Sequence, residues 1–135
     1  MTSPFCIEDF LRDPAYPQKS ILEKLLMHRL DVDRTWLLTH IEHKISPADR
    51  ARIDRAYHAY TVEDQPLEYI VGKVVFGGKT FVVGPATLIP RPETEYMIEA
   101  VCGRLPSCST DIILIDVGTG CGVLGVSTLL HAGAI

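Results

Sequence analysis

The chain has 135 residues, of which 47% are hydrophobic and 22% are charged, and its formal net charge is -4 at pH 7. This balance is typical of a soluble globular protein, and the negative charge argues against a general nucleic-acid surface. The opening residues have no basic region and no glycine after Met1, and no apolar run approaches the roughly 20 residues of a membrane span. We therefore expect a cytoplasmic protein that neither spans a membrane nor carries a secretion or myristoylation signal.

The four cysteines and five histidines are scattered along the chain at irregular spacings. There is no Cys-x-x-Cys pair, and no histidine has a second ligand at a spacing typical of a zinc site. The sequence therefore predicts reduced thiols and no metal site.

Residues 4 to 62 have the pattern of four short amphipathic helices. The first is expected from Ser3-Pro4 through Leu11, because proline suits a first helical turn. The second carries an apolar stripe formed by Ile21, Leu22, Leu25, Leu26 and Leu30. Because helices this short cannot bury their stripes alone, the segment predicts a small helical bundle.

The third and fourth helices have recognisable N-terminal caps. Asp33 precedes the third, whose predicted apolar positions are Trp36, Leu37, Ile41 and Ile45. The segment Ser46-Pro47-Ala48-Asp49 resembles a capping box with proline at the first helical position. In the fourth helix the predicted inward positions are Ile53, Ala56, Tyr57 and Tyr60. We assign residues 1–64 to a helical N-terminal domain.

From Gln65 the pattern changes to two β-runs on either side of Gly77-Gly78. The first run extends from Tyr69 to Phe76 and the second from Thr80 to Val83. A glycine pair between two apolar runs is a strong hairpin signal. We therefore expect a β-hairpin linker over residues 65–85.

A further helix is predicted after the two prolines of Leu88 to Glu95. Pro92 suits a first helical turn, and Glu93 and Glu95 complement the helix dipole. This helix is expected to end near Gly103, and its predicted apolar positions are Tyr96, Met97, Ala100 and Val101.

The stretch from Ile112 to Leu130 has the pattern of a strand, a glycine-rich turn and a helix. Its apolar run ends at Asp116, and glycines follow at alternate positions 118, 120 and 122. An apolar run without alternation suits a parallel strand that is buried on both faces. Glycines at the turn allow positive φ and the close approach of a ligand.

Two ligand classes compete for this turn. Gly120, Gly122 and Gly125 satisfy the dinucleotide pattern G-x-G-x-x-G, but in a poor register, because Gly118 already makes the turn. The segment from Asp116 to Gly122 resembles motif I of class I S-adenosylmethionine-dependent methyltransferases, and a carboxylate there suits a ligand with an ammonium group. A turn that binds nothing is the structural alternative.

Four segments together point to one family. They are Pro66 to Gly72, Phe76-Gly77-Gly78, Leu88 to Glu95 and Asp116 to Gly122. In combination they resemble the peptide chain release factor glutamine methyltransferases, the HemK/PrmC family. The glycine motif alone would indicate only a broad superfamily, whereas its pairing with Leu-Ile-Pro-Arg-Pro-Glu-Thr-Glu at this spacing is far more specific.

The resemblance implies an α/β protein: a helical substrate-recognition domain, a β-hairpin linker and, from residue 86, a Rossmann-like catalytic domain. It implies methyl transfer from S-adenosylmethionine to the glutamine side-chain amide in the Gly-Gly-Gln motif of release factors. Asp116 would order the ammonium group of the cofactor, and the approach to the active site would include Arg91, Pro92 and Glu93. The implied cofactor site is Asp116, Gly118, Thr119, Gly120, Cys121 and Gly122.

The substrate motif of the family, Asn-Pro-Pro-Tyr, is absent from these 135 residues, which contain no Pro-Pro dipeptide. No catalytic residue is therefore assigned. A parallel sheet of one strand would leave its backbone groups unpaired. We expect residues 86–135 to be the first βα unit of a truncated methyltransferase domain, with no strong binding of S-adenosylmethionine.

Two other functions remain open. One is a different class I N-methyltransferase that acts on adenine in nucleic acid, although the net charge and the lack of a basic patch weigh against it. The other is not enzymatic: the helical bundle and the hairpin would form a module that binds release factors or the ribosome.

Overall fold

The computed structural model describes residues 5–105 and 113–133. The chain forms two compact units, Met1–Val71 and Gly72–Ile135, which we call the N-terminal and C-terminal units. Each unit has its own cluster of buried apolar side chains. Among the described residues, no helix combines the length and the apolar character that crossing a membrane requires.

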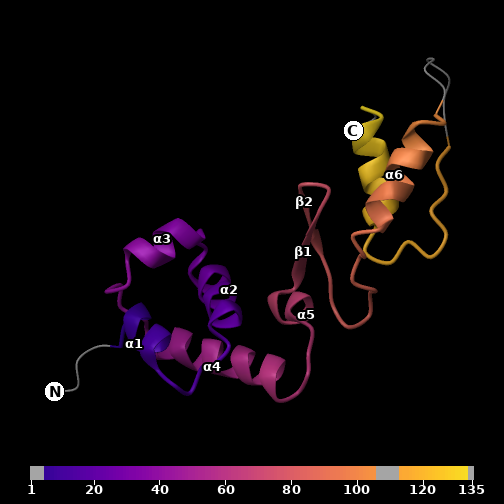
Figure 1. Cartoon of the computed structure of the whole chain (residues 1–135). Coiled ribbons are helices and arrows are strands. Elements are labelled where there is room, and N and C mark those ends of the chain that lie inside the picture. Colours follow the sequence, from indigo (N-terminus) through magenta and orange to yellow (C-terminus); the bar gives the residue numbers. More distant parts are fainter. Residues whose placement is uncertain (1–4, 106–112, 134–135) are drawn as a thin grey trace. The chain divides into compact units, whose positions relative to one another are not determined.

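The N-terminal unit is built from helices (Figure 1), and an isolated antiparallel β-bridge joins Cys6 to Lys44. Its helices are α1 (Ile7–Arg12), α2 (Lys19–Leu30), α3 (Arg34–Thr39), α4 (Pro47–Thr61) and α5 (Leu67–Val71). Their apolar faces meet in one core, in which Phe10, Leu22 and Leu37 are completely buried. The predicted helical bundle is confirmed.

The predicted caps of α3 and α4 are also confirmed. Asp33 Oδ1 accepts a hydrogen bond from the backbone N–H of Trp36 at 2.7 Å, and Ser46 Oγ accepts one from Asp49 at 3.0 Å. Asp49 in turn accepts a bond from Arg29 Nε of α2 at 2.6 Å. The hydrogen bonds from Ser46 and Arg29 lower the pKa of the Asp49 carboxyl group below its ordinary value.

The first helix begins later than predicted. The proposed start at Ser3-Pro4 lies outside the described residues, and α1 begins at Ile7, after Cys6. The backbone N–H of Cys6 donates to Asp9 Oδ2 at 2.7 Å. This bond is the main cause that lowers the pKa of Asp9.

The third helix ends earlier than predicted, at Thr39, so Ile41 and Ile45 are not helical. Ile45 still belongs to the core, because an extended segment carries it there. Its backbone N–H donates to the carbonyl of Phe5 at 2.8 Å, and its side chain is 5% exposed.

The prediction that Tyr69 to Val71 belong to a strand is wrong, because these residues form the end of α5. The carbonyl of Pro66 accepts hydrogen bonds from Tyr69 and Ile70, which close this short helix. Ile70 and Val71 pack against the helical core. Apolar residues predicted for the hairpin therefore complete the bundle.

The C-terminal unit contains the predicted hairpin. Its elements are β1 (Lys73–Phe76), β2 (Lys79–Val82), α6 (Thr94–Cys102) and α7 (Val123–His131). The strands are antiparallel, with Phe76 opposite Lys79. Gly77 and Gly78 have φ of 53° and 71°, as a two-residue turn between twisted strands requires. The hairpin turn is confirmed.

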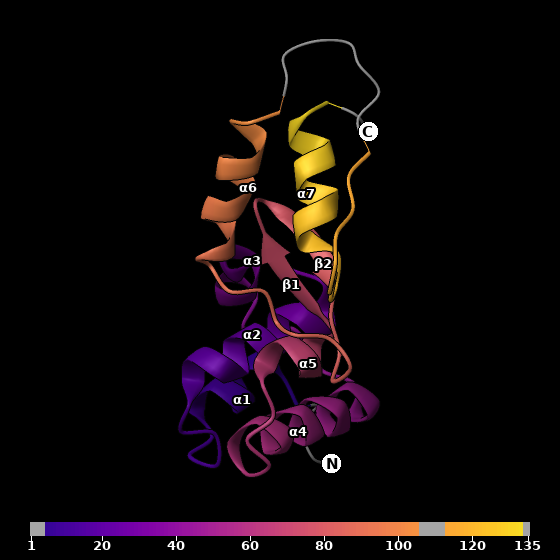
Figure 2. The ribbon, with the colours of Figure 1, turned by 90° about the vertical axis from the view of Figure 1, so that its right-hand side faces the viewer.

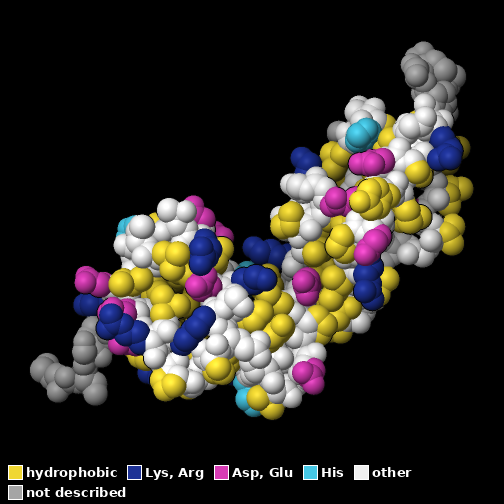
Figure 3. Space-filling view, in the orientation of Figure 1, with side chains coloured by type: hydrophobic (Ala, Val, Ile, Leu, Met, Phe, Trp, Pro, Cys, Tyr) yellow, Lys and Arg dark blue, Asp and Glu magenta, His cyan; other side chains and the backbone are white. Residues whose placement is uncertain are grey.

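Helices α6 and α7 lie side by side in the C-terminal unit (Figure 2). The contact between α6 and α7 is part of the second core, whose buried members are Phe76, Phe81, Ile98 and Val123. The prediction of the apolar face of α6 is wrong. The α6 residues in this core are Ile98 and Cys102, which lie one turn apart. The predicted positions are all exposed: Tyr96, Met97, Ala100 and Val101. Figure 3 shows hydrophobic side chains on the surface over this helix.

The strand predicted before the glycine loop is not formed in its described part. Ile112 lies outside the described residues, and residues 113–116 have no regular secondary structure. Ile113 and Ile115 are 87% and 78% exposed. A strand needs a neighbour for its backbone groups, and among the described residues the only sheet is the pair β1–β2. Of the predicted Rossmann-like βα unit, the structure confirms the glycine loop and its helix.

Candidate cofactor site

The glycine loop has the backbone conformation that its sequence predicts. Gly118, Gly120 and Gly122 have φ of 73°, 57° and 82°. These values lie in the left-handed region, which side chains other than glycine occupy only with strain. The loop is closed by a hydrogen bond of 2.8 Å from the N–H of Gly122 to the carbonyl of Thr119.

Asp116 connects this loop to the first turn of α7 through hydrogen bonds. Its Oδ2 accepts hydrogen bonds from the N–H of Gly125 and from Thr119 Oγ1, each at 3.1 Å. A carboxylate is favourable there, because the first N–H groups of a helix lack partners within the helix and carry partial positive charge. Among the described residues, the second oxygen, Oδ1, has no hydrogen-bond partner.

Gly125 makes this approach possible. A Cβ built on Gly125 would lie 3.1 Å from Asp116 Oδ2, closer than an ordinary van der Waals contact. Gly125 is also the third glycine of the dinucleotide pattern. Here it serves as the backbone donor that positions the carboxylate.

Cys121 links the loop to the core of the C-terminal unit. Its half-buried side chain packs against the cluster that contains Phe76, Phe81 and Val123. Thr119 and Gly120 are exposed. The core of the C-terminal unit therefore supports one side of the glycine loop, while other loop residues remain accessible.

The predicted substrate-approach residues precede α6 in the C-terminal unit. Arg91, Pro92 and Glu93 are exposed on the turn before α6, where the carbonyl of Arg91 accepts a bond of 2.9 Å from the N–H of Thr94. Within residues 5–105 and 113–133, no hydrogen bond or ion pair joins these side chains to the glycine loop. Their role at an active site remains a prediction.

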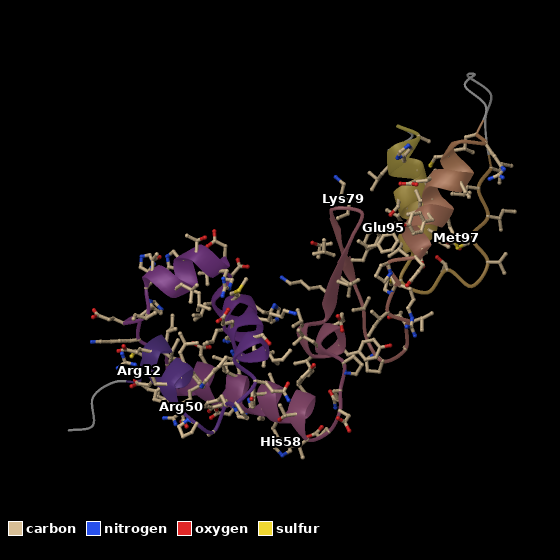
Figure 4. All side chains as sticks on the ribbon, in the orientation of Figure 1. Arg12, Arg50, His58, Lys79, Glu95 and Met97 are labelled. Atoms are coloured by element: carbon tan, nitrogen blue, oxygen red, sulfur yellow. The ribbon has the colours of Figure 1, made fainter. Side chains whose placement is uncertain are left out.

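Glu95 makes a contact that sequence reasoning missed. Its Oε1 accepts a hydrogen bond from the N–H of Gly77 at 3.0 Å, and Figure 4 shows Glu95 at the start of α6 and Lys79 at the hairpin turn. The bond ties the turn to α6. The sequence placed an acid in the first turn of the helix, but only the fold shows which donor it faces.

The described residues contain no group of three His, Cys, Asp or Glu side chains placed to hold a metal ion. The polar groups described at this site are backbone N–H groups, the Asp116 carboxylate, the Thr119 hydroxyl and the Cys121 thiol.

Comparison with known proteins defines the class of the chain. Residues 7–72 match the family model of the PrmC N-terminal domain. The chain is 42% identical over 105 residues to a release factor glutamine methyltransferase of Koribacter versatilis (strain Ellin345), an alignment that covers 78% of this chain and 37% of the relative. It is 34% identical over 124 residues to the protein of the same name from Bordetella pertussis, with 92% and 45% covered.

The chain thus carries a helical unit of the PrmC N-terminal type. Its N-terminal part belongs to the PrmC N-terminal domain family, and most of the chain is similar to release factor glutamine methyltransferases. It spans between 37% and 45% of the length of these two relatives.

Proposed function

We propose that the protein takes part in methyl transfer from S-adenosylmethionine to the glutamine side-chain amide of the Gly-Gly-Gln motif in release factors. In this proposal the loop from Asp116 to Gly122 forms the wall of the cofactor site around the methionine part. The N-terminal unit recognises the release factor, and the reaction takes place in the cytoplasm. The names of the relatives support the substrate, and the loop geometry supports the cofactor.

The observation that carries the proposal is the placement of the Asp116 carboxylate beside three left-handed glycines at the start of α7. The methionine part of S-adenosylmethionine ends in an ammonium and a carboxylate group. The open oxygen of Asp116 suits the ammonium group, and the N-terminus of α7 suits the carboxylate. When bound, the cofactor supplies the activated methyl group, while the loop residues bind and orient it.

The site is tested by recording ¹⁵N–¹H NMR spectra of the full chain during a titration with S-adenosylmethionine. We expect weak binding in which the largest shifts fall on the amides of Gly118, Gly120 and Gly122. The position of the shifts, independent of the affinity, tests the assignment.

Asp116→Asn separates charge from loop structure. The asparagine keeps an oxygen that can accept from Gly125, but it loses the charge that attracts an ammonium group, so binding should weaken about tenfold. Asp13→Asn, which changes the same charge in the N-terminal unit, should leave binding unchanged. Shifts spread over the N-terminal unit, or equal affinities of the two variants, would contradict the proposed cofactor wall.

A further inference from the structure

A groove opens in the N-terminal unit on a surface formed by α2, α4 and α5. Its volume is about 170 Å³, slightly more than the cavity of about 150 Å³ that holds a benzene molecule in an engineered protein. The groove therefore has room for one aliphatic or aromatic side chain. Its lining residues are Leu25, His28, Arg29, Arg52, Ile53, Ala56 and Ile70.

The floor and the rim of this groove differ in chemistry. Leu25 and Ile53 are each 2% exposed, and they form an apolar floor. The rim carries the exposed side chains of His28, Arg29 and Arg52. An apolar floor with a basic rim suits a ligand in which carboxylates flank one large apolar group.

The basic rim is a local feature of an acidic unit. Residues 1–71 contain nine Lys and Arg against twelve Asp and Glu, yet no carboxylate lines the groove. Arg29 is paired with Asp49 at 2.5 Å. Arg52 lies close enough to Asp49 for their charges to interact, but it has neither a hydrogen bond nor an ion pair among the described residues, so its N–H groups are available to a partner.

We propose that this groove is a docking site for an acidic peptide segment that inserts one large apolar side chain. The apolar side chain would cover Leu25 and Ile53, and flanking carboxylates would pair with Arg52 and share Arg29. No Phe, Tyr or Trp side chain lines the groove, so it lacks the large aromatic rings on which bases stack in a typical single-stranded nucleic-acid site. The groove lies on the N-terminal unit and its ligand is a peptide, so its test does not depend on cofactor binding at the glycine loop.

The test measures binding of short peptides to the full 135-residue chain by ¹⁵N–¹H NMR. The probes are Glu-Glu-Leu-Glu-Glu, a version with Ser in place of Leu, and Lys-Lys-Leu-Lys-Lys. We expect the first to shift the amides of Leu25, Ala56 and Ile70. The Ser version should bind about tenfold more weakly, because it buries no apolar side chain, and the lysine version should not bind measurably.

Two substitutions on α4 form a matched pair. Arg52→Glu reverses the rim charge, and Arg55→Glu makes the same change at an exposed position that does not line the groove. We expect the first to weaken the acidic leucine peptide about fivefold or more and the second to leave it unchanged. Ala56→Leu, which fills the groove, should abolish the preference for Leu over Ser while circular dichroism shows a folded chain.

Three results would overturn the proposal. They are equal binding of the three peptides, equal effects of Arg52→Glu and Arg55→Glu, and shifts that fall outside the groove. A five-nucleotide oligothymidylate that bound as tightly as the acidic leucine peptide would also overturn it, because the groove would then respond to negative charge alone.

Discussion

Replacing Tyr16 with phenylalanine tests a polar contact inside the helical core of the N-terminal unit. The Tyr16 side chain is 8% exposed, and its hydroxyl donates to Asp54 Oδ1 at 2.5 Å. Its ring packs edge-on against Phe10 and Tyr57, with centroids 5.2 and 5.0 Å away. Phenylalanine keeps these ring contacts and removes only the hydroxyl group.

The size of the expected loss in unfolding free energy depends on the hydrogen-bond acceptor, the Asp54 carboxylate. A hydrogen bond to a charged group contributes about 1.5–3 kcal/mol. Asp54 is only half-buried, so water replaces part of the lost bond. We therefore expect Tyr16→Phe to reduce the free energy of unfolding by about 1.5 kcal/mol, at the lower end of that range.

Urea unfolding measures this loss through the fluorescence of Trp36, the only tryptophan of the chain, which packs against the same core. Tyr60→Phe is the matched control, because Tyr60 lies at this core and its hydroxyl has no hydrogen bond among the described residues. The control should change stability by less than about 0.5 kcal/mol. Equal losses in both variants, or no loss in Tyr16→Phe, would refute the reasoning.

The same contact predicts a dependence on pH. Burial, together with the bond to Asp54, raises the pKa of Tyr16 above its ordinary value of 10.0. Above about pH 10 the unfolded chain loses this proton while the folded chain keeps it, so stability falls as pH rises. Tyr16→Phe should show a shallower fall in urea unfolding followed by circular dichroism. Parallel curves for the two proteins would contradict the assignment.

Three further substitutions test local features. Gly122→Ala places a side chain at φ 82° and should destabilise the C-terminal unit by about 1–2 kcal/mol in thermal unfolding. Gly84→Ala, at an unstrained position with no atom within 4 Å of the new Cβ, should not destabilise it. Equal effects of the two substitutions would contradict the strain argument. Asp33→Ala removes the N-terminal cap of α3 and should lower the free energy of unfolding in urea by about 1 kcal/mol. An unchanged midpoint of the urea transition would show that the cap contributes nothing. Glu95→Ala should speed hydrogen exchange at the Gly77 amide, and unchanged exchange would show that the bond does not hold the turn.

The features that sequence predicted correctly are local. The caps at Asp33 and Ser46 need only residues three positions apart. The turn at Gly77-Gly78 needs only two glycines between apolar runs. In each case the side chain or backbone that completes the feature lies within a few residues, so no knowledge of the fold is required.

The features that sequence missed depend on distant partners. Ile70 and Val71 suit a strand as well as a helix. Their contact with the helical core favours the helix α5. In α6 two apolar stripes compete, and the packing of α7 selects the one with Ile98. For the site, the motif predicted the left-handed glycines, but the bonds from Gly125 to Asp116 and from Gly77 to Glu95 join residues 9 and 18 positions apart.

The proposed function is participation in the methylation of release factors. Its most direct test is mass spectrometry of the Gly-Gly-Gln peptide of release factors from source cells with and without the gene that contains this sequence. We expect one methyl group on the glutamine side-chain amide in the intact cells and none after deletion. Full methylation after deletion would contradict it.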